Sequence, residues 1–311
     1  MSVPDVESPI YRIRFHGRGG QGMKTASRIL GTAFFVAGFE VQDAPRYGAE
    51  RRGAPIFAYV RASRAIINER GIIHRPDLVV VADETLVGIP AAGVLHGVGE
   101  TTVTLIYSDR EPAGWQERYA PLKNVVTLPR QDEPRHGQHF VSAICAGAAA
   151  RLSGVISRSC LEEAVRQELA GHGLDMVRAN LSRALDAYDL MAPFSRLVIA
   201  GAGENDGLPD IPDWIELPFD PARISAPTIH AALTSEQVAT GLWRTLRPVI
   251  DAKSCLRCGL CSSYCPEGAI SRDAEGMPDI DYAHCKGCMI CIVECPAHAI
   301  HPERETARGR E

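Results

Sequence analysis

Residues 255–270, "CLRCGLCSSYCPEGAI", and residues 285–300, "CKGCMICIVECPAHAI", carry the same cysteine pattern. Each segment reads C-x2-C-x2-C-x3-C-P, and the shift that takes Cys255 to Cys285 superposes all four cysteines and the proline. This repeat shift also pairs Pro248 with Pro278 and Asp251 with Asp281. This part of the chain therefore contains two copies of one half-module.

The cysteine spacing predicts two [4Fe-4S] clusters that exchange one ligand between the halves. Three cysteines at x2 intervals wrap a loop around one cluster, and the fourth, which follows a short helical step, ligates the other cluster. The first cluster is expected on Cys255, Cys258, Cys261 and Cys295, and the second on Cys285, Cys288, Cys291 and Cys265. So small a domain buries little apolar area, and the clusters are expected to hold its fold.

Other metal centres fit this cysteine pattern less well. Four thiolates also suit zinc, but zinc modules typically use two C-x2-C pairs, in which the third cysteine and the C-P step have no role. A Rieske centre replaces cysteine with histidine. Three histidines flank the ligands, yet all eight cysteines are present; these histidines are His284, His298 and His301.

Composition and charge exclude several functional classes. The chain has 33 Lys and Arg against 38 Asp and Glu, and it has no long basic run, which argues against nucleic acid as the main partner. The long apolar stretch at 141–156 is interrupted by Arg151 and is shorter than the ~20 residues of a membrane span. Residues 1–10 lack the regions of a signal peptide. We therefore expect a cytoplasmic protein.

The N-terminal part of the chain, up to the run at 124–129, predicts an α/β domain. Runs rich in Val, Ile and Thr predict strands at 10–16, 54–63, 77–84, 101–108 and 124–129, and the helix after Gly22 is the clearest crossover. This order favours a doubly wound, mostly parallel sheet with helices on both faces.

Helices and a linker complete the predicted organisation. Helices are expected at 139–152, at 157–169 with a capping box from Ser159 to Glu162, and at about 173–191. Residues 199–227 are dense in Gly, Pro and Asp and read as a linker. The prediction is an α/β domain at 1–198, a linker strap at 199–240 and a small α+β two-cluster domain at 241–311.

A glycine-rich turn lies between the first strand and the first helix. In "FHGRGGQGMKTASRIL" (15–30), Gly17, Gly19 and Gly22 have the G-x-G-x-x-G order of a dinucleotide-binding turn. Glu40 and Asp43 lie near the ~20-residue distance expected of a ribose-binding acid. The same glycines also serve merely to let a helix pack closely on a strand, so both interpretations stay open.

The loop "PRYGAERRGAP" (45–55) carries Arg46, Arg51 and Arg52 between glycines. A solvated basic loop is one interpretation, because exposed ion pairs contribute little. The other is an interface or anion site, where a guanidinium makes bidentate contacts to carboxylate or phosphate.

These segments together resemble a known family. The runs "GRGGQGMKTASRIL", "YGAERRGAPIFAYVRAS" and "PDLVVVAD" resemble the gamma subunit of the 2-oxoacid:ferredoxin oxidoreductases, the group that contains pyruvate:ferredoxin oxidoreductase. The part from "GLWRTLRPVIDAKSC" (241–255) through the cysteines resembles the ferredoxin-like delta subunit, including its W-R-x-x-R-P lead. The order of the two resemblances indicates a gamma–delta fusion.

The resemblance implies an electron-transfer and structural subunit. In such a complex, alpha and beta subunits hold thiamine diphosphate with Mg and decarboxylate a 2-oxoacid. Electrons then leave singly through iron–sulfur clusters to ferredoxin or another acceptor, and the acyl group goes to coenzyme A. The thiamine motif, G-D-G followed by Asn-Asn, is absent from this sequence, and no catalytic residue is assigned to it.

The resemblance also adds an interpretation of the two loops. Subunit docking or contact with a phosphate of coenzyme A is expected for Gly17, Gly19, Gly20, Gly22, Arg51 and Arg52. The alternative function is a stand-alone NAD(P)H-linked iron–sulfur reductase that uses the glycine turn. Such an enzyme needs a flavin between the two-electron carrier and the clusters, and no second nucleotide motif is visible.

Overall fold

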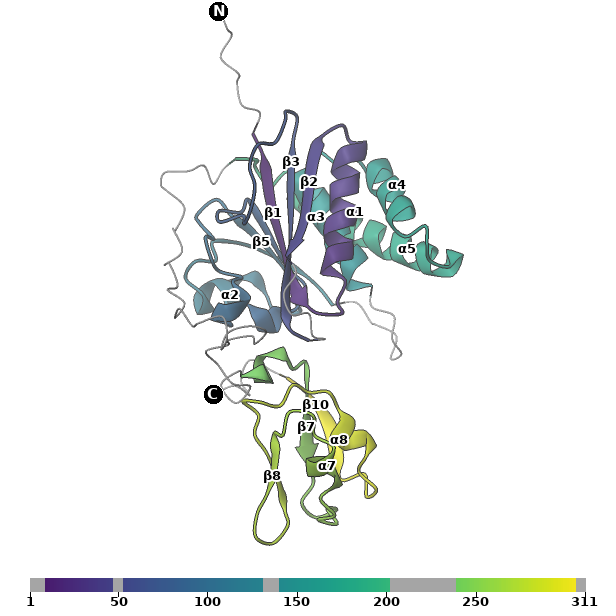
Figure 1. Ribbon diagram of the computed structural model, residues 1–311. Coiled ribbons are helices and arrows are strands. Elements are labelled where there is room, and N and C mark those ends of the chain that lie inside the picture. The colour runs from purple at the N-terminus through teal and green to yellow at the C-terminus, as the bar shows by residue number, and fades with distance from the viewer. Residues whose placement is uncertain (1–8, 47–52, 131–139, 202–238, 306–311) are drawn as a thin grey trace, which may run out of the picture. The chain divides into compact units, whose positions relative to one another are not determined.

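The computed structural model describes residues 9–46, 53–130, 140–201 and 239–305. The chain divides into two units, Met1–Glu204 and Asn205–Glu311 (Figure 1). Most of the predicted linker, 202–238, lies outside the described residues, so the boundaries of the predicted domains remain a prediction.

The first unit is built on a six-stranded sheet in the order β2-β3-β1-β4-β5-β6. Strands β1, β4, β5 and β6 run parallel, while β3 is antiparallel to both β1 and β2. The predicted mostly parallel α/β fold is confirmed. The strands are β1 (Tyr11–Arg18), β2 (Glu40–Arg46), β3 (Pro55–Ser63), β4 (Leu78–Val81), β5 (Val103–Tyr107) and β6 (Asn124–Leu128).

Helices α1 (Met23–Val36) and α3 (Val141–Ser153) lie in the core with one face of the sheet. Side chains alternate along β1, so that Ile13 and Phe15 join this core and are fully buried. Helices α4 (Arg158–Glu168) and α5 (Leu174–Leu190) pack outside α1 and α3, and the short helix η3 (Ala192–Phe194) follows them.

The cap of α4 differs from the predicted one. Ser157, not Ser159, is its N-cap, and the Oγ atom of Ser157 accepts a hydrogen bond from the N–H of Cys160. Ser157 has the extended backbone that a cap requires, and Ser159 already lies inside the helix.

The connections on the other face run in the opposite direction along the sheet. Helix α1 leads from β1 toward β2, whereas η1 (Glu84–Leu86), η2 (Pro90–Ala92) and α2 (Pro112–Arg118) lead from β4 toward β6. Right-handed crossovers that run in opposite directions lie on opposite faces. The sheet is therefore doubly wound, and its switch point lies between β1 and β4.

The second unit has an internal two-fold pattern. Strand β7 (Leu246–Ile250) pairs with β10 (Ile300–Arg304), and β8 (Ile270–Arg272) pairs with β9 (Pro278–Ile280), both antiparallel. The repeat shift takes Ile250 to Ile280 and Ile270 to Ile300. The pair formed by Ile250 and Ile300 therefore corresponds to the pair formed by Ile280 and Ile270. Short helices α7 (Leu260–Ser263) and α8 (Ile290–Val293) complete the halves, and η5 (Thr240–Trp243) precedes them.

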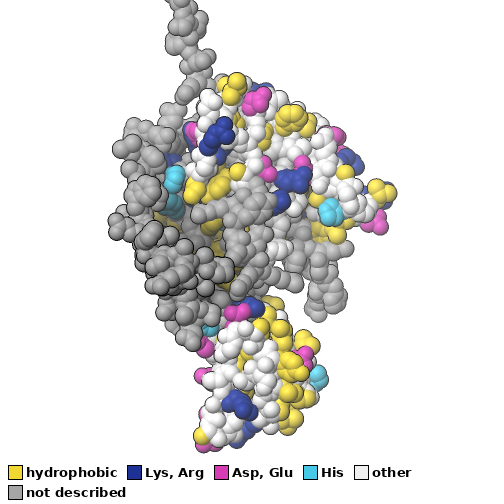
Figure 2. Space-filling model, in the orientation of Figure 1, with side chains coloured by type: hydrophobic (Ala, Val, Ile, Leu, Met, Phe, Trp, Pro, Cys, Tyr) yellow, Lys and Arg dark blue, Asp and Glu magenta, His cyan; other side chains and the backbone are white. Residues whose placement is uncertain are grey.

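Hydrophobic side chains gather along one side of this unit (Figure 2). Its exposed large hydrophobic residues include Leu260, Tyr264, Ile290 and Val293, which lie on or next to α7 and α8. Among the residues that the structure describes, no helix is long and apolar enough to cross a membrane.

Candidate functional site

Backbone hydrogen bonds interlock the two half-modules of the second unit. The N–H of Asp251, in the first half, donates to the carbonyl oxygen of Ala299 at 2.7 Å. The N–H of Asp281, in the second half, donates to that of Ala269 at 2.9 Å. The start of each half-module is therefore hydrogen-bonded to the end of the other half-module. The bonded residue at that end lies four positions after the fourth cysteine, Cys295 or Cys265.

This interlocking collects the cysteines around two cavities. The first, about 360 Å³ including its opening to solvent, is lined by three cysteines of the first half and one of the second: Cys255, Cys258, Cys261 and Cys295. The second, about 320 Å³, is lined by Cys265, Cys285, Cys288 and Cys291. The structure thus brings together the same two sets that the spacing predicts.

The residues around each cavity fit a four-iron cluster. Four sulfur donors are the ligand set of such clusters, and prolines and isoleucines complete the walls.

Left-handed backbone shapes the loops that carry the cysteines. Helices α7 and α8 begin after Gly259 (φ 75°) and Met289 (φ 66°), which correspond under the repeat shift. Two backbone N–H groups also point at sulfur: that of Arg257 toward Sγ of Cys255 at 3.4 Å, and that of Ala299 toward Sγ of Cys295 at 3.3 Å. Such donors stabilise negative charge on thiolates.

Burial opposes ionisation of these thiols in the absence of metal. It raises the pKa of Cys261 and Cys285, and it raises the pKa of Cys291 to about 12. For Cys285, the N–H of Gly287 and the charge of Arg244 act in the opposite direction on the pKa. Because metal ligands are thiolates, metal binding must release these protons.

The flanking histidines do not line either cavity. His284 contacts Asp281, with 2.6 Å between Nδ1 and Oδ2, and His301 lies 3.9 Å from Glu303. His298 occupies a left-handed position (φ 49°) where the other half has Gly268. The two other cysteines lie in the first unit, where Cys145 is buried within α3 and Cys160 is half-buried at the start of α4.

The glycine turn joins β1 to α1 in the first unit. Gly22, the N-cap of α1, has a left-handed φ of 73°, and a Cβ on it would lie 3.1 Å from Cβ of Ser142. A Cβ on Gly17 would lie 2.5 Å from Cγ of Met23. Gly19 exchanges backbone hydrogen bonds with the segment before β3, to Ala54 at 2.8 Å and from Gly53 at 3.1 Å. Gly20 completes the turn with a φ of 96°.

The predicted basic loop at 45–55 is described only in part. Arg51 and Arg52 lie outside the described residues, as does the side chain of Arg46 at the end of β2. The described chain resumes at Gly53, whose backbone contacts Gly19.

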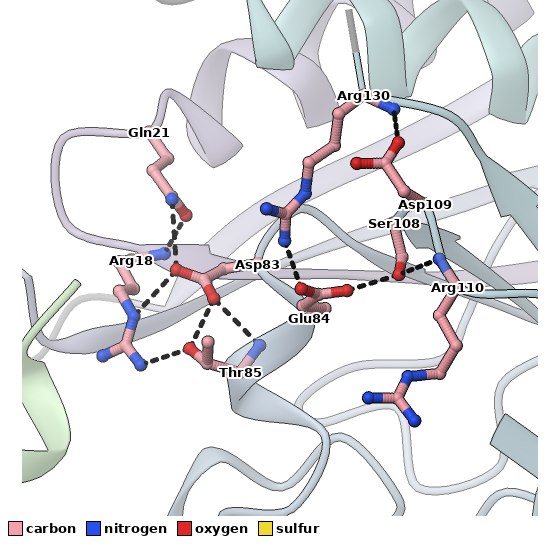
Figure 3. Close-up of polar contacts among 9 residues, drawn as sticks. All are labelled: Arg18, Gln21, Asp83, Glu84, Thr85, Ser108, Asp109, Arg110 and Arg130. Atoms are coloured by element: carbon pink, nitrogen blue, oxygen red, sulfur yellow. Dashed lines mark hydrogen bonds and ion pairs between the residues drawn. The ribbon is translucent and has the colours of Figure 1, made fainter. Parts of the chain in front are cut away.

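A polar cluster lies at the carboxyl ends of the parallel strands (Figure 3). Nε of Arg18 lies 2.9 Å from Oδ2 of Asp83, and Nη2 donates to Oγ1 of Thr85 at 2.7 Å. Gln21 bridges the same residues: its Oε1 accepts from the N–H of Arg18 at 2.7 Å, and its Nε2 donates to Asp83 at 3.3 Å. Burial alone would raise the pKa of Asp83, but Arg18 and Thr85 outweigh burial and lower it.

The cluster continues along the edge toward β5 and β6. Glu84 accepts hydrogen bonds from the hydroxyl of Ser108 and from the guanidinium of Arg130 (Figure 3). The backbone N–H of Arg130 donates to Oδ1 of Asp109 at 2.8 Å. Ligands of doubly wound sheets bind at this edge, beside the switch point. This cluster was not among the predicted sites, although Asp83 and Ser108 each closely follow a buried strand, a position that often carries functional side chains in such sheets.

The acid predicted for NAD binding does not lie beside the glycine turn. In dinucleotide-binding folds the second strand is next to the first. Here β3 lies between β1 and β2, the strand that carries Glu40 and Asp43. Asp43 instead lies against α1: burial raises its pKa, and Ser27 and Arg28 of that helix partly oppose the rise.

Comparisons with known proteins cover both units. The family model described as pyruvate ferredoxin/flavodoxin oxidoreductase matches residues 12–190, and a 4Fe-4S dicluster domain model matches residues 247–296. The common gamma subunit of pyruvate/ketoisovalerate oxidoreductases of Pyrococcus furiosus is 32% identical over 180 residues, which are 57% of this chain and 95% of that protein. The pyruvate synthase subunit PorC of Thermotoga maritima is 45% identical over 166 residues, 52% of this chain and 84% of that protein.

A solved structure aligns with the same region. The crystal structure of pyruvate oxidoreductase subunit PORC from Thermotoga maritima has 26% sequence identity and a TM-score of 0.46. The alignment covers 58% of this chain and 96% of that one.

Proposed function

Because this chain belongs to the pyruvate ferredoxin/flavodoxin oxidoreductase family, we propose that it is the electron-transfer and structural subunit of a 2-oxoacid oxidoreductase. It combines a gamma-type domain with a ferredoxin-like dicluster domain. We assign decarboxylation to thiamine diphosphate and Mg on alpha and beta partner subunits, and acyl transfer to coenzyme A. This chain then passes single electrons to ferredoxin or another acceptor.

The sorting of cysteines from both half-modules into two cavities carries this proposal. We assign one cluster to Cys255, Cys258, Cys261 and Cys295, and the other to Cys265, Cys285, Cys288 and Cys291. When bound, such clusters accept and release one electron at a time. The chain supplies the thiolates, the N–H donors of Arg257 and Ala299, and apolar walls that limit water.

The carboxyl edge of the first unit is the proposed contact with the rest of the complex. We assign subunit docking or contact with a phosphate of coenzyme A to Gly17, Gly19, Gly20 and Gly22, and also to Arg51 and Arg52, which lie outside the described residues. The start of α1 supports this assignment, because a helix N-terminus carries partial positive charge. Arg18 is not part of it, because its guanidinium is buried against Asp83.

Metal analysis of anaerobically prepared protein tests the assignment of clusters. Two four-iron clusters require about eight iron and about eight acid-labile sulfide per chain. Cys265→Ala should damage the cluster of Cys285, although it lies nearer in sequence to Cys261. Cys160→Ala is the matched control, since it removes a half-buried thiol far from both cavities in sequence. Stoichiometric zinc without sulfide contradicts the proposal, and loss of the other cluster contradicts the exchange of ligands.

Assembly and turnover test the role in a complex. The chain alone should not decarboxylate a 2-oxoacid with added thiamine diphosphate, and should support turnover once alpha and beta subunits are added. Charge reversal at Arg51 and Arg52 should weaken assembly or coenzyme A-dependent turnover and leave iron content unchanged. Anaerobic NADH should not bleach the clusters of the isolated chain. Bleaching would instead support the stand-alone reductase.

A further inference from the structure

Arg244, from the W-R-x-x-R-P lead, is buried against the loop that carries Cys285. Its Nη1 donates to the carbonyl oxygen of Cys285 at 2.7 Å and also to that of Tyr282. Its Nε donates to Oε2 of Glu305 at 2.6 Å, and the two side chains are 5% and 1% exposed. A guanidinium withdrawn from water therefore contacts the backbone of a proposed cluster ligand.

The surrounding chain holds this arginine in a fixed place. A Cβ on Gly287 would lie 2.6 Å from Cγ of Arg244, so the ligand loop is packed directly on the arginine stem. The N–H of Gly241 donates to Ala283 at 2.8 Å, and that of Glu305 donates to Thr245 at 2.9 Å. Residues before and after the half-modules thus close over the same loop.

Within the described residues, the first half-module has no arginine at the position equivalent to Arg244. The repeat shift places Ala274 at the corresponding position. Cations near the first site, Arg257 and Arg272, are exposed, and water and salt screen exposed charges. At the second site, Lys286 is paired with Glu267 at 2.6 Å. Among the described cations near the two sites, the guanidinium of Arg244 is therefore the one that water and salt screen least.

We propose that Arg244 makes the two clusters unequal, so that the cluster on Cys265, Cys285, Cys288 and Cys291 has the higher reduction potential. Reduction by an external donor adds one electron and one negative charge, which a nearby cation favours. The negative charge of Glu305 opposes this effect. However, Glu305 accepts a hydrogen bond from Nε of Arg244, whereas Nη1 of Arg244 donates to the carbonyl oxygen of Cys285. A single electron on the domain then resides mostly at the second site. This inference rests on the proposed function, because it requires both clusters.

An anaerobic redox titration of the full chain, followed by electron paramagnetic resonance, tests the inference. We expect two one-electron steps whose equilibrium constants differ at least tenfold, which is about 59 mV for a one-electron couple. Cys258→Ser and Cys288→Ser alter exposed cysteines at equivalent positions and identify the two signals. The step at higher potential should be the one altered by Cys288→Ser.

Charge variants distinguish the electrostatic role of Arg244 from a structural one. Arg244→Gln should lower the equilibrium constant of the reduction step at higher potential about tenfold. Arg244→Lys, which keeps the positive charge, should restore much of that equilibrium constant. Because Arg244→Gln leaves Glu305 buried and unpaired, the double variant Arg244→Gln/Glu305→Gln provides a second, milder test with a smaller shift of the same sign. Arg247→Gln is the control. Arg247 also lies over the Tyr282 ring, but its ion pair with Glu303 is partly exposed to solvent, so its loss should shift neither reduction step.

The outcomes separate the two proposals. Fewer than two clusters by iron and sulfide content contradicts the proposed function itself. Two clusters with equal potentials, or a separation unchanged in both Arg244→Gln and the double variant, overturns the role of Arg244 and leaves the proposed function standing.

Discussion

Arg18 and Asp83 form a buried ion pair at the carboxyl edge of the sheet, with 2.9 Å between Nε and Oδ2 (Figure 3). Arg18 ends β1 and Asp83 follows β4, so the pair joins the two strands that flank the switch point. The side chains are 1% and 10% exposed. Removing both charges from water is costly, and the hydrogen bonds from Thr85 and Gln21 to Asp83 help to offset that cost.

Arg18→Met should therefore destabilise the first unit strongly. It leaves Asp83 buried without its cation, a change that typically costs about 3–5 kcal/mol. Urea unfolding followed by circular dichroism measures the loss. The control is Arg158→Met, whose partner Asp189 lies 3.4 Å away in a pair that is about half exposed, and which should cost less than about 1 kcal/mol. Equal losses for the two variants would contradict the structural role of the buried pair.

Gly22→Ala should destabilise the junction of β1 and α1. The left-handed φ of 73° costs an L-residue about 1–2 kcal/mol, and the new Cβ would press on Ser142. Gly171→Ala is the matched control, because no atom lies within 4 Å of its added Cβ and its φ is not left-handed. If the two variants unfold at the same urea concentration, the turn does not require its glycine.

Most of the sheet could be predicted because its strands are continuous buried runs. "VVVA" and "TLIY" are buried on both faces, as central parallel strands are. Strand β2 (Glu40–Arg46) was not among the predicted strands. Its sequence "EVQDAPR" is polar and contains proline, which an edge strand tolerates, and only its pairing with β3 makes it a strand.

The candidate sites differ in how much of each could be predicted from the sequence. The cysteine sets follow from local spacing and one internal repeat, so the residues around each cavity could be predicted. The cluster at the sheet edge depends on pairs such as Arg18 with Asp83, 65 residues apart, and these require the strand order. The glycine order suggested that an acidic residue of β2 would bind the ribose of a dinucleotide. In the structure, β3 lies between β2 and β1.

The stability of the first unit should fall between pH 7 and pH 5 because of His16. Burial, together with the charge of Arg14, lowers the pKa of His16 to about 3, so the folded protein keeps this ring neutral. The unfolded chain takes up a proton below about pH 6.5, so it binds more protons than the folded state and stability decreases as pH falls. The expected loss is about 2 kcal/mol at pH 5.

Two variants isolate this effect. His16→Asn keeps a donor toward the carbonyl oxygen of Ala92, which Nδ1 of His16 contacts at 3.1 Å, but it cannot take up the proton. It should be less stable at pH 7 and should lose most of the dependence on pH. His172→Asn removes an exposed histidine and should retain the dependence. A slope that persists in His16→Asn would assign the proton uptake to another group.

Removal of iron should unfold the second unit and leave the first one folded. Among the described residues, the buried hydrophobic cluster of the second unit consists of three cysteines and four small or medium apolar residues, namely Cys261, Cys285, Cys291, Ala269, Ile270, Ile280 and Ile300. So few apolar side chains cannot offset the conformational entropy of about 65 residues, and metal binding must contribute to folding. The first unit has its own large core around α1 and α3 and holds none of the proposed ligands.

Hydrogen exchange measured before and after oxidative treatment with a chelator checks this expectation. Amides of β7 and β10 should lose their protection, since within the described residues these strands form a two-stranded sheet, while amides of β1 and β4 in the first unit should keep theirs. The variant Cys285→Ala tests the same coupling without a chelator and should expose the loop that Arg244 contacts. Protection of β7 and β10 that survives complete loss of iron would show that the short strands and their isoleucines are stable without the clusters.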